Sequence, residues 1–180
     1  MNTIALFGGS FDPPHTGHTA IVNALEKLDY IDKIIIMPTF LNPFKSSSHA
    51  SSLLRLQWLK CIFSNHKNVL IDSYEVRQEK KVPTIESVLY LLKRYQKIFV
   101  VIGADNVATL GQWYRYDELK EKVTFIIATR ENIKIPKEFI PLEVDVDISS
   151  SELREVMDET KLTEQCADEI AQYYKETNAR

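Results

Sequence analysis

Two histidines stand close together in a segment rich in glycine and proline that follows a short apolar run. The segment, residues 8–18, reads GGSFDPPHTGH, and its histidines are His15 and His18. Paired glycines let a backbone approach a ligand closely, and a helix that begins after the prolines presents free N–H groups to an anion. Because His15 and His18 have i, i+3 spacing at the start of that helix, both rings can face one phosphate oxygen and donate to it. The segment therefore indicates a phosphate-binding loop.

Two other interpretations of these histidines are open. A histidine in a loop is often only solvated or hydrogen-bonded to its surroundings. A His-x-x-His pair also binds zinc, but His49, His66 and the two cysteines show no third-ligand spacing nearby. We therefore expect no metal held by protein ligands. The segment fits neither GxGxxG nor GxxxxGK[ST], which excludes the dinucleotide-binding fingerprint and the P-loop on pattern.

A second group of hydrogen-bond donors lies far along the chain, where residues 148–154 read ISSSELR. Ser149 followed by Glu152 is the capping-box pattern that begins a helix. Free N–H groups, serine hydroxyls and Arg154 in the first turns of that helix would offer several donors to an anion. Taken alone, the same pattern also fits a capped surface helix with a solvated arginine.

A third group follows the apolar run at 98–102. Gly103 permits the close approach of a base or sugar, and Asp105 can accept hydrogen bonds from ribose hydroxyls. Trp113, in the segment QWYRY at 112–116, offers a flat face to a heteroaromatic ring. Ordinary packing of the Trp-Tyr pair is the alternative.

These segments resemble known signatures. Residues 8–18 resemble the H-x-G-H loop of the nucleotidyltransferase superfamily, G-[GS]-[ST]-F-D-P-x-[HT]-x-G-H, and residues 148–154 resemble its I-S-S-[ST]-x-[IL]-R. The run from 103 to 116 looks like the bacterial nicotinate-mononucleotide adenylyltransferases, in which the tryptophan stacks on the pyridine ring. Residues 83–87, PTIES, resemble the segment that helps to hold the nicotinate nucleotide. The resemblance covers residues 1–157.

The sequence departs from the family pattern in three places. Phe44, in NPFK at 42–45, stands where histidine is usual, which leaves Lys45 available for phosphate but removes one polar contact. Glu131 follows Arg130 where the family often has proline and glycine. Beyond residue 157 the tail matches poorly.

The resemblance implies adenylyl transfer from ATP to nicotinate mononucleotide, which gives deamido-NAD and pyrophosphate. It implies catalytic roles for His15, His18, Lys45 and Arg154. The implied ATP site comprises Gly8, Gly9, Ser10, Phe11, His18, Gly103, Asp105, Ile148, Ser149, Ser150 and Arg154. The implied site for the nicotinate nucleotide comprises Lys45, Thr84, Asp105, Trp113 and Tyr114. Mg²⁺ would be carried by the ATP phosphates rather than by a protein cage.

Rival functions of two classes stay open. An adenylyltransferase with this loop could instead act on nicotinamide mononucleotide or on phosphopantetheine. The phosphopantetheine enzymes have T-x-G-H in place of residues 15–18 and lack the W-Y-R-Y segment. The other class is a non-catalytic nucleotide sensor that keeps the fold, but a binding module has no need of His15, His18 and Arg154 together.

The elements that must position these groups alternate along the chain. Apolar runs predict strands at 3–7, 33–37, 69–74, 98–102, 123–128 and 142–147. Apolar spacing predicts helices around 21–28, 52–63, 85–92, 153–157 and 167–174. This alternation predicts a single doubly wound, Rossmann-like α/β domain over residues 1–180, with a mostly parallel sheet, helices on both faces and a helical tail at 158–180. Ligands of such sheets bind at the carboxyl ends of the strands.

The composition, with 44% hydrophobic and 26% charged residues, is that of a soluble globular protein. A net charge of −3 argues against nucleic-acid binding, and the apolar runs are far shorter than the ~20 residues of a membrane span. Lys and Arg outnumber Asp and Glu in residues 1–130, and the reverse holds in 131–180, so the first part would better receive an anion.

Two cysteines do not make a disulfide framework, and with no secretory signal we expect a reducing cytoplasm. The sequence leaves open whether the chain forms a homo-oligomer.

Overall fold

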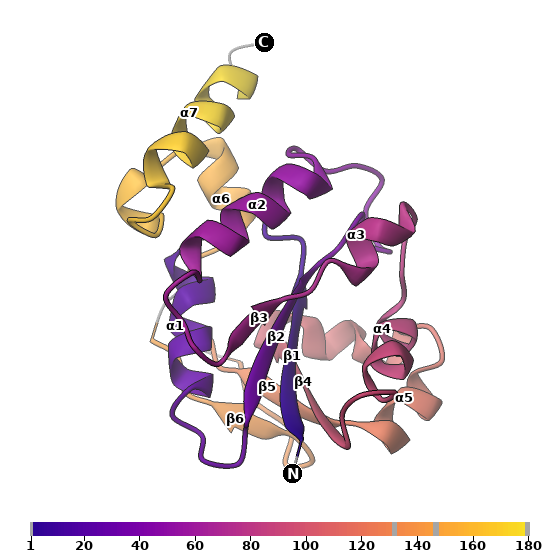
Figure 1. Ribbon diagram of the computed structural model, residues 1–180. Coiled ribbons are helices and arrows are strands. Elements are labelled where there is room, and N and C mark those ends of the chain that lie inside the picture. The colour runs from indigo at the N-terminus through magenta and orange to yellow at the C-terminus, as the bar shows by residue number, and fades with distance from the viewer. Residues whose placement is uncertain (1, 131–132, 146–147, 179–180) are drawn as a thin grey trace.

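Six strands form one parallel sheet in the order β3-β2-β1-β4-β5-β6 (Figure 1). The computed structural model describes residues 2–130, 133–145 and 148–178. The strands are β1 (Thr3–Gly9), β2 (Lys33–Pro38), β3 (Val69–Ile71), β4 (Lys97–Gly103), β5 (Thr124–Ala128) and β6 (Ile140–Leu142). The α-helices are α1 (Thr16–Leu25), α2 (Ser52–Ile62), α3 (Tyr74–Gln78), α4 (Thr84–Leu91), α5 (Tyr116–Lys122), α6 (Ser150–Glu155) and α7 (Ala167–Asn178). Two 3₁₀ segments, η1 (Ala104–Gln112) and η2 (Glu159–Lys161), complete the fold. The predicted doubly wound α/β architecture is confirmed.

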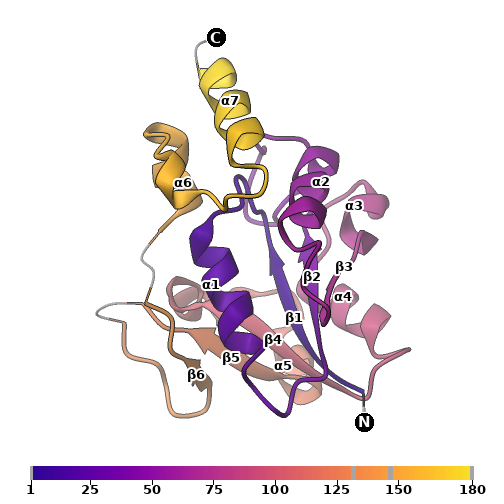
Figure 2. The ribbon, with the colours of Figure 1, turned by 60° about the vertical axis from the view of Figure 1, so that its left-hand side comes forward.

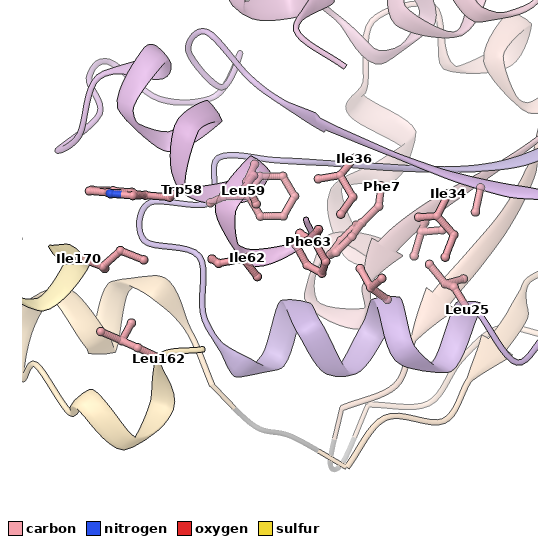
Figure 3. Packing of buried hydrophobic residues seen from close by; sticks show 14 of the residues in the cluster. Phe7, Leu25, Ile34, Ile36, Trp58, Leu59, Ile62, Phe63, Leu162 and Ile170 are labelled. Carbon is pink, nitrogen blue, oxygen red and sulfur yellow. The ribbon is translucent and has the colours of Figure 1, made fainter. Parts of the chain in front are cut away.

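Both faces of the sheet are covered by helices, which explains why the strands read as continuous apolar runs. Ala5 and Phe7 of β1 pack in one buried cluster with α1, α2, α6 and α7, part of which Figure 3 shows around Phe7 and Leu25. Ile4 and Leu6 point the other way and pack with α4, η1 and α5. Each fully buried side chain of this kind stabilises the fold by about 1.5–3 kcal/mol.

The strand order reverses between β1 and β4. From β1 the chain continues to β2 on one side of it, whereas β4, which pairs with the other side of β1, continues to β5. Helices that follow β1 and β4 therefore leave toward opposite faces, and their departure opens a crevice above the carboxyl ends of these two strands. Figures 1 and 2 both place α7 beside α2, and both α6 and α7 near the carboxyl end of β1.

Two predicted strands are wrong at their ends. The strand predicted at 69–74 stops at Ile71, because the Asp72 carboxylate accepts a hydrogen bond from Tyr74 N at 2.8 Å and helps to begin α3 there. The strand predicted at 142–147 instead occupies Ile140–Leu142, and its final residues, 146–147, lie outside the described part of the chain. Leu142 pairs with Ala128, the last residue of β5, so the ladder between the described parts of the two strands ends there.

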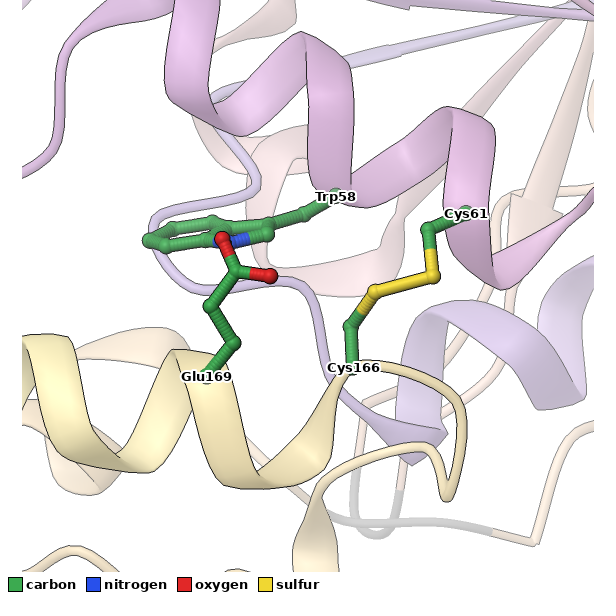
Figure 4. Close-up of a disulfide and its surroundings, with 4 residues drawn as sticks. All are labelled: Trp58, Cys61, Cys166 and Glu169. Atoms are coloured by element: carbon green, nitrogen blue, oxygen red, sulfur yellow. A yellow bond between two sulfur atoms is a disulfide. The ribbon is translucent and has the colours of Figure 1, made fainter.

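The carboxyl-terminal segment also differs from expectation. Helix α6 ends at Glu155, and Val156, predicted on its apolar face, is 74% exposed. Helix α7 extends to Asn178. Cys61, at the end of α2, forms a disulfide with Cys166, just before α7 (Figure 4). The cysteine count had led us to expect no structural disulfide, and this expectation is wrong because the tail folds back onto a helix 105 residues earlier.

Candidate active site

A cleft of about 620 Å³ lies above the carboxyl ends of β1 and β4, where the strand order reverses. It is lined by nearly all of the residues that the sequence analysis assigned to the ATP and acceptor sites. These are Gly8, Gly9, Ser10, Phe11, His15, His18, Lys45, Thr84, Gly103, Asp105, Trp113, Tyr114, Ile148, Ser149 and Ser150. Arg154 alone among the predicted site residues is absent from the described residues that line the cleft.

His15 and His18 cap the helix α1 reciprocally. Nδ1 of His15 accepts a hydrogen bond from Gly17 N at 3.1 Å, and Nδ1 of His18 accepts one from His15 N at 3.1 Å. The two rings stack with their centroids 3.7 Å apart. A Cβ atom at residue 17 would lie 2.9 Å from the His15 ring, so this arrangement needs Gly17. The pair thus has the geometry of a capping box built from imidazoles.

This geometry fixes the chemical state of both rings. Because each Nδ1 accepts a backbone N–H, a neutral ring carries its proton on Nε2, which makes Nε2 the donor. Burial, and then the charge of Arg130, lowers the pKa of His15 to about 4. Burial and the adjacent His15 lower the pKa of His18 well below its usual value. Both histidines are therefore neutral donors at pH 7.

The histidine pair does not form a metal site with other residues. Among the residues that the structure describes, there is no group of three or more His, Cys, Asp or Glu side chains that could hold a metal ion. The Nδ1 atoms of His15 and His18 are already occupied by backbone N–H groups.

Asp12 anchors the loop between β1 and α1, which was predicted to bind phosphate, and the sequence analysis missed this role. Its carboxylate is buried and accepts hydrogen bonds from His49 N at 2.7 Å, from Ala50 N at 3.0 Å and from the hydroxyl of Tyr174. These contacts hold His49 and Ala50, which lie just before α2, against the loop between β1 and α1.

Arg55 is the second residue that sequence reasoning missed. Its side chain is fully buried on α2 and donates to the backbone carbonyls of Ser10 at 2.5 Å, Thr39 at 2.9 Å and Phe40 at 3.0 Å. A buried guanidinium is tolerated only when its donors are satisfied, and here they tie together loops that follow β1 and β2. Its position one turn before Leu59 on the apolar face of the helix was the available signal.

Helix α6 packs against the loop between β1 and α1. The Ser149 hydroxyl accepts from Glu152 N at 3.2 Å, which confirms the predicted cap. Ser150 Oγ donates to Pro13 O at 2.9 Å, and Arg154 Nη1 donates to Asp12 O at 2.5 Å. Arg154 therefore holds the backbone of the phosphate-binding loop, and a direct contact with phosphate stays a prediction.

Lys45 lies at the rim of the cleft in the loop after β2. Asn42 folds this loop, because its Oδ1 accepts from Phe44 N and its backbone carbonyl accepts from Lys45 N, each at 2.9 Å. Burial of the ammonium group and the charges of Arg154 and Arg55 lower the pKa of Lys45, against the opposing effect of Asp12. Phe44, which replaces the family histidine, is 65% exposed and also lines the cleft.

Four of the predicted acceptor residues, Thr84, Asp105, Trp113 and Tyr114, line the same cleft as Lys45. Trp113 follows η1, and Thr84 is the first residue of α4. A Cβ atom at Gly103 would lie 2.8 Å from Asp105 Oδ1, so the position of that carboxylate depends on glycine. Asp105 Oδ2 pairs with Arg130 Nη1 at 3.3 Å. Glu131, whose effect on this loop was in question, lies outside the described residues.

Glu75 also lines the cleft, and the sequence analysis did not predict it as a site residue. Its Oε1 accepts a hydrogen bond from the Ser87 hydroxyl at 2.6 Å, and its buried Oε2 has no partner among the described residues. Burial raises the pKa of Glu75 to about 7, although the hydrogen bond from Ser87 opposes this shift.

Comparison with known proteins identifies the family. Residues 6–156 match the family model described as cytidylyltransferase-like. A protein of Sulfurimonas denitrificans is 59% identical over 100% of this chain and 99% of its own, and one of Nitratiruptor is 49% identical over 96% and 98%. Both carry the name probable nicotinate-nucleotide adenylyltransferase. The chain belongs to the nicotinate-nucleotide adenylyltransferase family.

Solved structures agree in fold with this family assignment. The nicotinic acid mononucleotide adenylyltransferase of Plasmodium falciparum complexed with NaAD has a TM-score of 0.77 at 21% identity, over 97% of this chain and 98% of that one. The same enzyme complexed with APC has a TM-score of 0.72 at 20% identity, over 99% and 96%. The family relatives also extend over the carboxyl-terminal tail, which the sequence analysis had judged a poor match. No helix in the described part of this chain is long and apolar enough to cross a membrane.

Proposed function

We propose that the chain, acting as one nucleotidyltransferase domain over residues 1–180, transfers the adenylyl group of ATP to nicotinate mononucleotide, a step of NAD biosynthesis. The observation that carries the proposal is a cleft at β1 and β4 whose lining includes residues predicted for both the ATP site and the acceptor site. Membership in the nicotinate-nucleotide adenylyltransferase family supports the choice of acceptor.

The reaction needs positioned donors more than it needs a base. The 5′-phosphate oxygen of the acceptor attacks the α-phosphorus of ATP, and the bond from that phosphorus to the bridging oxygen breaks to release pyrophosphate. The attacking oxygen is already ionised at neutral pH, so catalysis consists of positioning and stabilisation of charge. Neutral His18 would donate from Nε2 to the α-phosphate as charge develops, and His15 would help to place the phosphates.

The cationic groups would act on the departing pyrophosphate. Lys45 lines the cleft near the loop that Arg154 holds, and the N-terminus of α6 offers Ser149 and Ser150 to the same region. Arg154 would keep the loop in its binding conformation through its bond to Asp12 O, and its remaining N–H groups would be available to a phosphate. Mg²⁺ bound to the phosphates would neutralise part of their charge, and the described residues provide no acidic cage for it.

The acceptor would occupy the Trp113 end of the cleft. Its pyridine ring would stack on the indole, and its carboxylate would lie near backbone N–H groups at Thr84 and Tyr114. Asp105 would accept hydrogen bonds from ribose hydroxyls. ATP and nicotinate mononucleotide would be the partners of this chain, located in the cytoplasm, without nucleic acid or membrane.

Pyrophosphate release tests the proposal directly. The purified protein with ATP and Mg²⁺ should release pyrophosphate when nicotinate mononucleotide is added, with a higher kcat/KM than for nicotinamide mononucleotide or phosphopantetheine. A preference for one of the other two acceptors would overturn the substrate assignment. If the protein bound ATP but released no pyrophosphate with any of the three acceptors, it would be a nucleotide sensor.

A further inference from the structure

The carboxyl-terminal helix α7 reaches the phosphate-binding loop through one hydroxyl group. Tyr174 is fully buried, and its hydroxyl donates a hydrogen bond to Oδ1 of Asp12, 162 residues earlier in the chain. Asp12 lies in the loop between β1 and α1, three residues before His15. The tail is thus in direct contact with the segment that leads to the two histidines.

The Asp12 carboxylate is a junction of several chain segments. Its Oδ1 accepts from Tyr174 and from Ala50 N, and its Oδ2 accepts from His49 N. The backbone carbonyl of Asp12 accepts from Arg154 Nη1. Loss of one donor would leave an oxygen of a buried carboxylate underbonded, which disturbs the junction as a whole.

Helix α7 is itself firmly attached, so it can act as a support for this hydroxyl. The Trp58 ring of α2 packs against Tyr174, with the ring centroids 5.9 Å apart, and Trp58 Nε1 donates to Glu169 Oε1 at 3.1 Å. The disulfide between Cys61 and Cys166 joins the same two helices, and Figure 4 shows it beside the Trp58–Glu169 contact. Helix α2 in turn carries Arg55, which donates to the loop after β1.

We propose that Tyr174 is a positioning residue for adenylyl transfer, which acts by holding Asp12 so that the following loop presents His15 and His18 to the phosphates. This inference rests on the proposed function. It also assigns a purpose to the tail: helix α7 stabilises the phosphate-binding loop through the bond from Tyr174 to Asp12 and does not itself contact substrate.

The hydrogen bond also affects the acid behaviour of Asp12. Burial by itself raises the pKa of this carboxyl, but the hydrogen bonds from Tyr174, His49 N and Ala50 N and the charge of Arg55 outweigh it, so the pKa lies below its usual value. Removal of the Tyr174 hydroxyl therefore raises the pKa of Asp12.

Other groups that face Asp12 would remain in place after that removal. The His49 ring lies with Nδ1 3.7 Å from Asp12 Oδ2, and Lys45 and Arg55 both interact electrostatically with Asp12. The acid limb of the kcat profile should consequently move to higher pH, as the loop loses its anionic anchor earlier in an acid titration.

The test compares Tyr174→Phe with Tyr173→Phe. The first variant keeps the buried ring and loses only the hydroxyl, whereas the second removes the neighbouring hydroxyl, which donates to His49 O at 3.0 Å and not to Asp12. We expect Tyr174→Phe to lower kcat by about tenfold, as for a lost hydrogen bond to a charged group, with little change in KM for ATP. Its acid limb should shift upward, and Tyr173→Phe should match wild type in kcat and in pH profile.

A double variant identifies the path through Asp12. If Tyr174 acts only by way of that carboxylate, Asp12→Asn with Tyr174→Phe should be no slower than Asp12→Asn alone. Tyr174→Phe with wild-type kcat and pH profile would overturn the inference, even if Asp12→Asn fails to fold. A wild-type protein that releases no pyrophosphate would overturn the proposed function instead, so the two failures are distinct.

Discussion

Arg154 donates from Nη1 to the backbone carbonyl oxygen of Asp12 at 2.5 Å, and thereby joins helix α6 to the phosphate-binding loop. Its Nη2 also donates to Ser151 Oγ at 3.2 Å. The guanidinium thus bridges two segments that lie far apart in the sequence and close in space. Because Arg154 is not among the described residues that line the cleft, we expect it to act mainly by holding this loop in place.

Arg154→Lys tests this clamp. An ammonium group is a compact charge and cannot reproduce the planar two-point contact, so the loop should lose its fixed conformation while the charge is retained. We expect kcat/KM for ATP to fall by about tenfold or more, with a thermal midpoint close to wild type. Wild-type kcat/KM for ATP, measured by pyrophosphate release, would show that the contact of the guanidinium with Asp12 O does not position the loop for catalysis.

His18→Ala removes the group that we propose donates to the α-phosphate as charge develops. The loss of one such donor typically lowers kcat by about 10²–10³-fold. KM for ATP should change less, because the interaction strengthens in the transition state. Loss of the cap on His15 N will also cost about 1 kcal/mol of stability, so a thermal melt should accompany the steady-state kinetics. A variant that retains more than half of the wild-type kcat would contradict the role of His18.

His15 should make stability depend on pH. Its pKa is about 4 in the folded protein because of burial and then Arg130, against an ordinary value of 6.5. Between these values the unfolded chain binds more protons, so the stability gained from neutral His15 is complete above pH 6.5 and is lost as the pH falls toward 4.

His15→Asn provides the measurement. Asparagine also accepts a backbone N–H at the start of a helix but does not titrate, so stability at pH 8 should stay near that of wild type. The free energy of unfolding should then fall less steeply between pH 6.5 and pH 4 than in wild type. The free energy of unfolding would be measured by urea denaturation at each pH. If it fell equally steeply with pH in the variant and in wild type, His15 would not be held neutral by the fold.

Much of the architecture could be predicted because its signals are local. Continuous apolar runs predicted β1, β2, β4 and β5, and the signature segments that follow β1 and β4 predicted the two halves of the cleft. The edge strand β6 was predicted at 142–147 from its apolar residues but occupies Ile140–Leu142, and it includes Pro141, which an edge strand tolerates.

What escaped prediction depends on contacts across long sequence distances. Asp12 is one polar residue of a turn-rich segment, and nothing local indicates Tyr174 as its partner. Arg55 lies on a helix face that otherwise carries apolar residues, and only the converging loop carbonyls explain its burial. The pairing of Cys61 with Cys166 likewise required the tail to be placed on α2.

The disulfide gives a stability prediction with an internal control. Closure of a loop of about 100 residues contributes roughly 4–5 kcal/mol in the chain-entropy account. Cys61→Ser and Cys166→Ser should lower the thermal midpoint to the same degree, because each removes the same bond. Reductant should lower the midpoint of wild type and leave both variants unchanged. Two reactive thiols in unfolded, unreduced protein would contradict the bond.

Trp113→Ala tests the assignment of the acceptor end of the cleft. A stacked aromatic pair contributes about 0.5–1.5 kcal/mol beyond the burial of area, and the substitution also removes apolar contact with the pyridine ring. KM for nicotinate mononucleotide should therefore rise by about tenfold, while KM for ATP should stay close to wild type because we expect adenine to bind away from Trp113. The ratio of kcat/KM between the nicotinate and nicotinamide nucleotides should be preserved, because the backbone N–H groups near Thr84 and Tyr114 are left in place. Trp113→Phe is the matched control, since it keeps an aromatic face and should recover most of the lost affinity. A rise in KM confined to ATP would instead place Trp113 in the adenine pocket and remove the main support for the acceptor site.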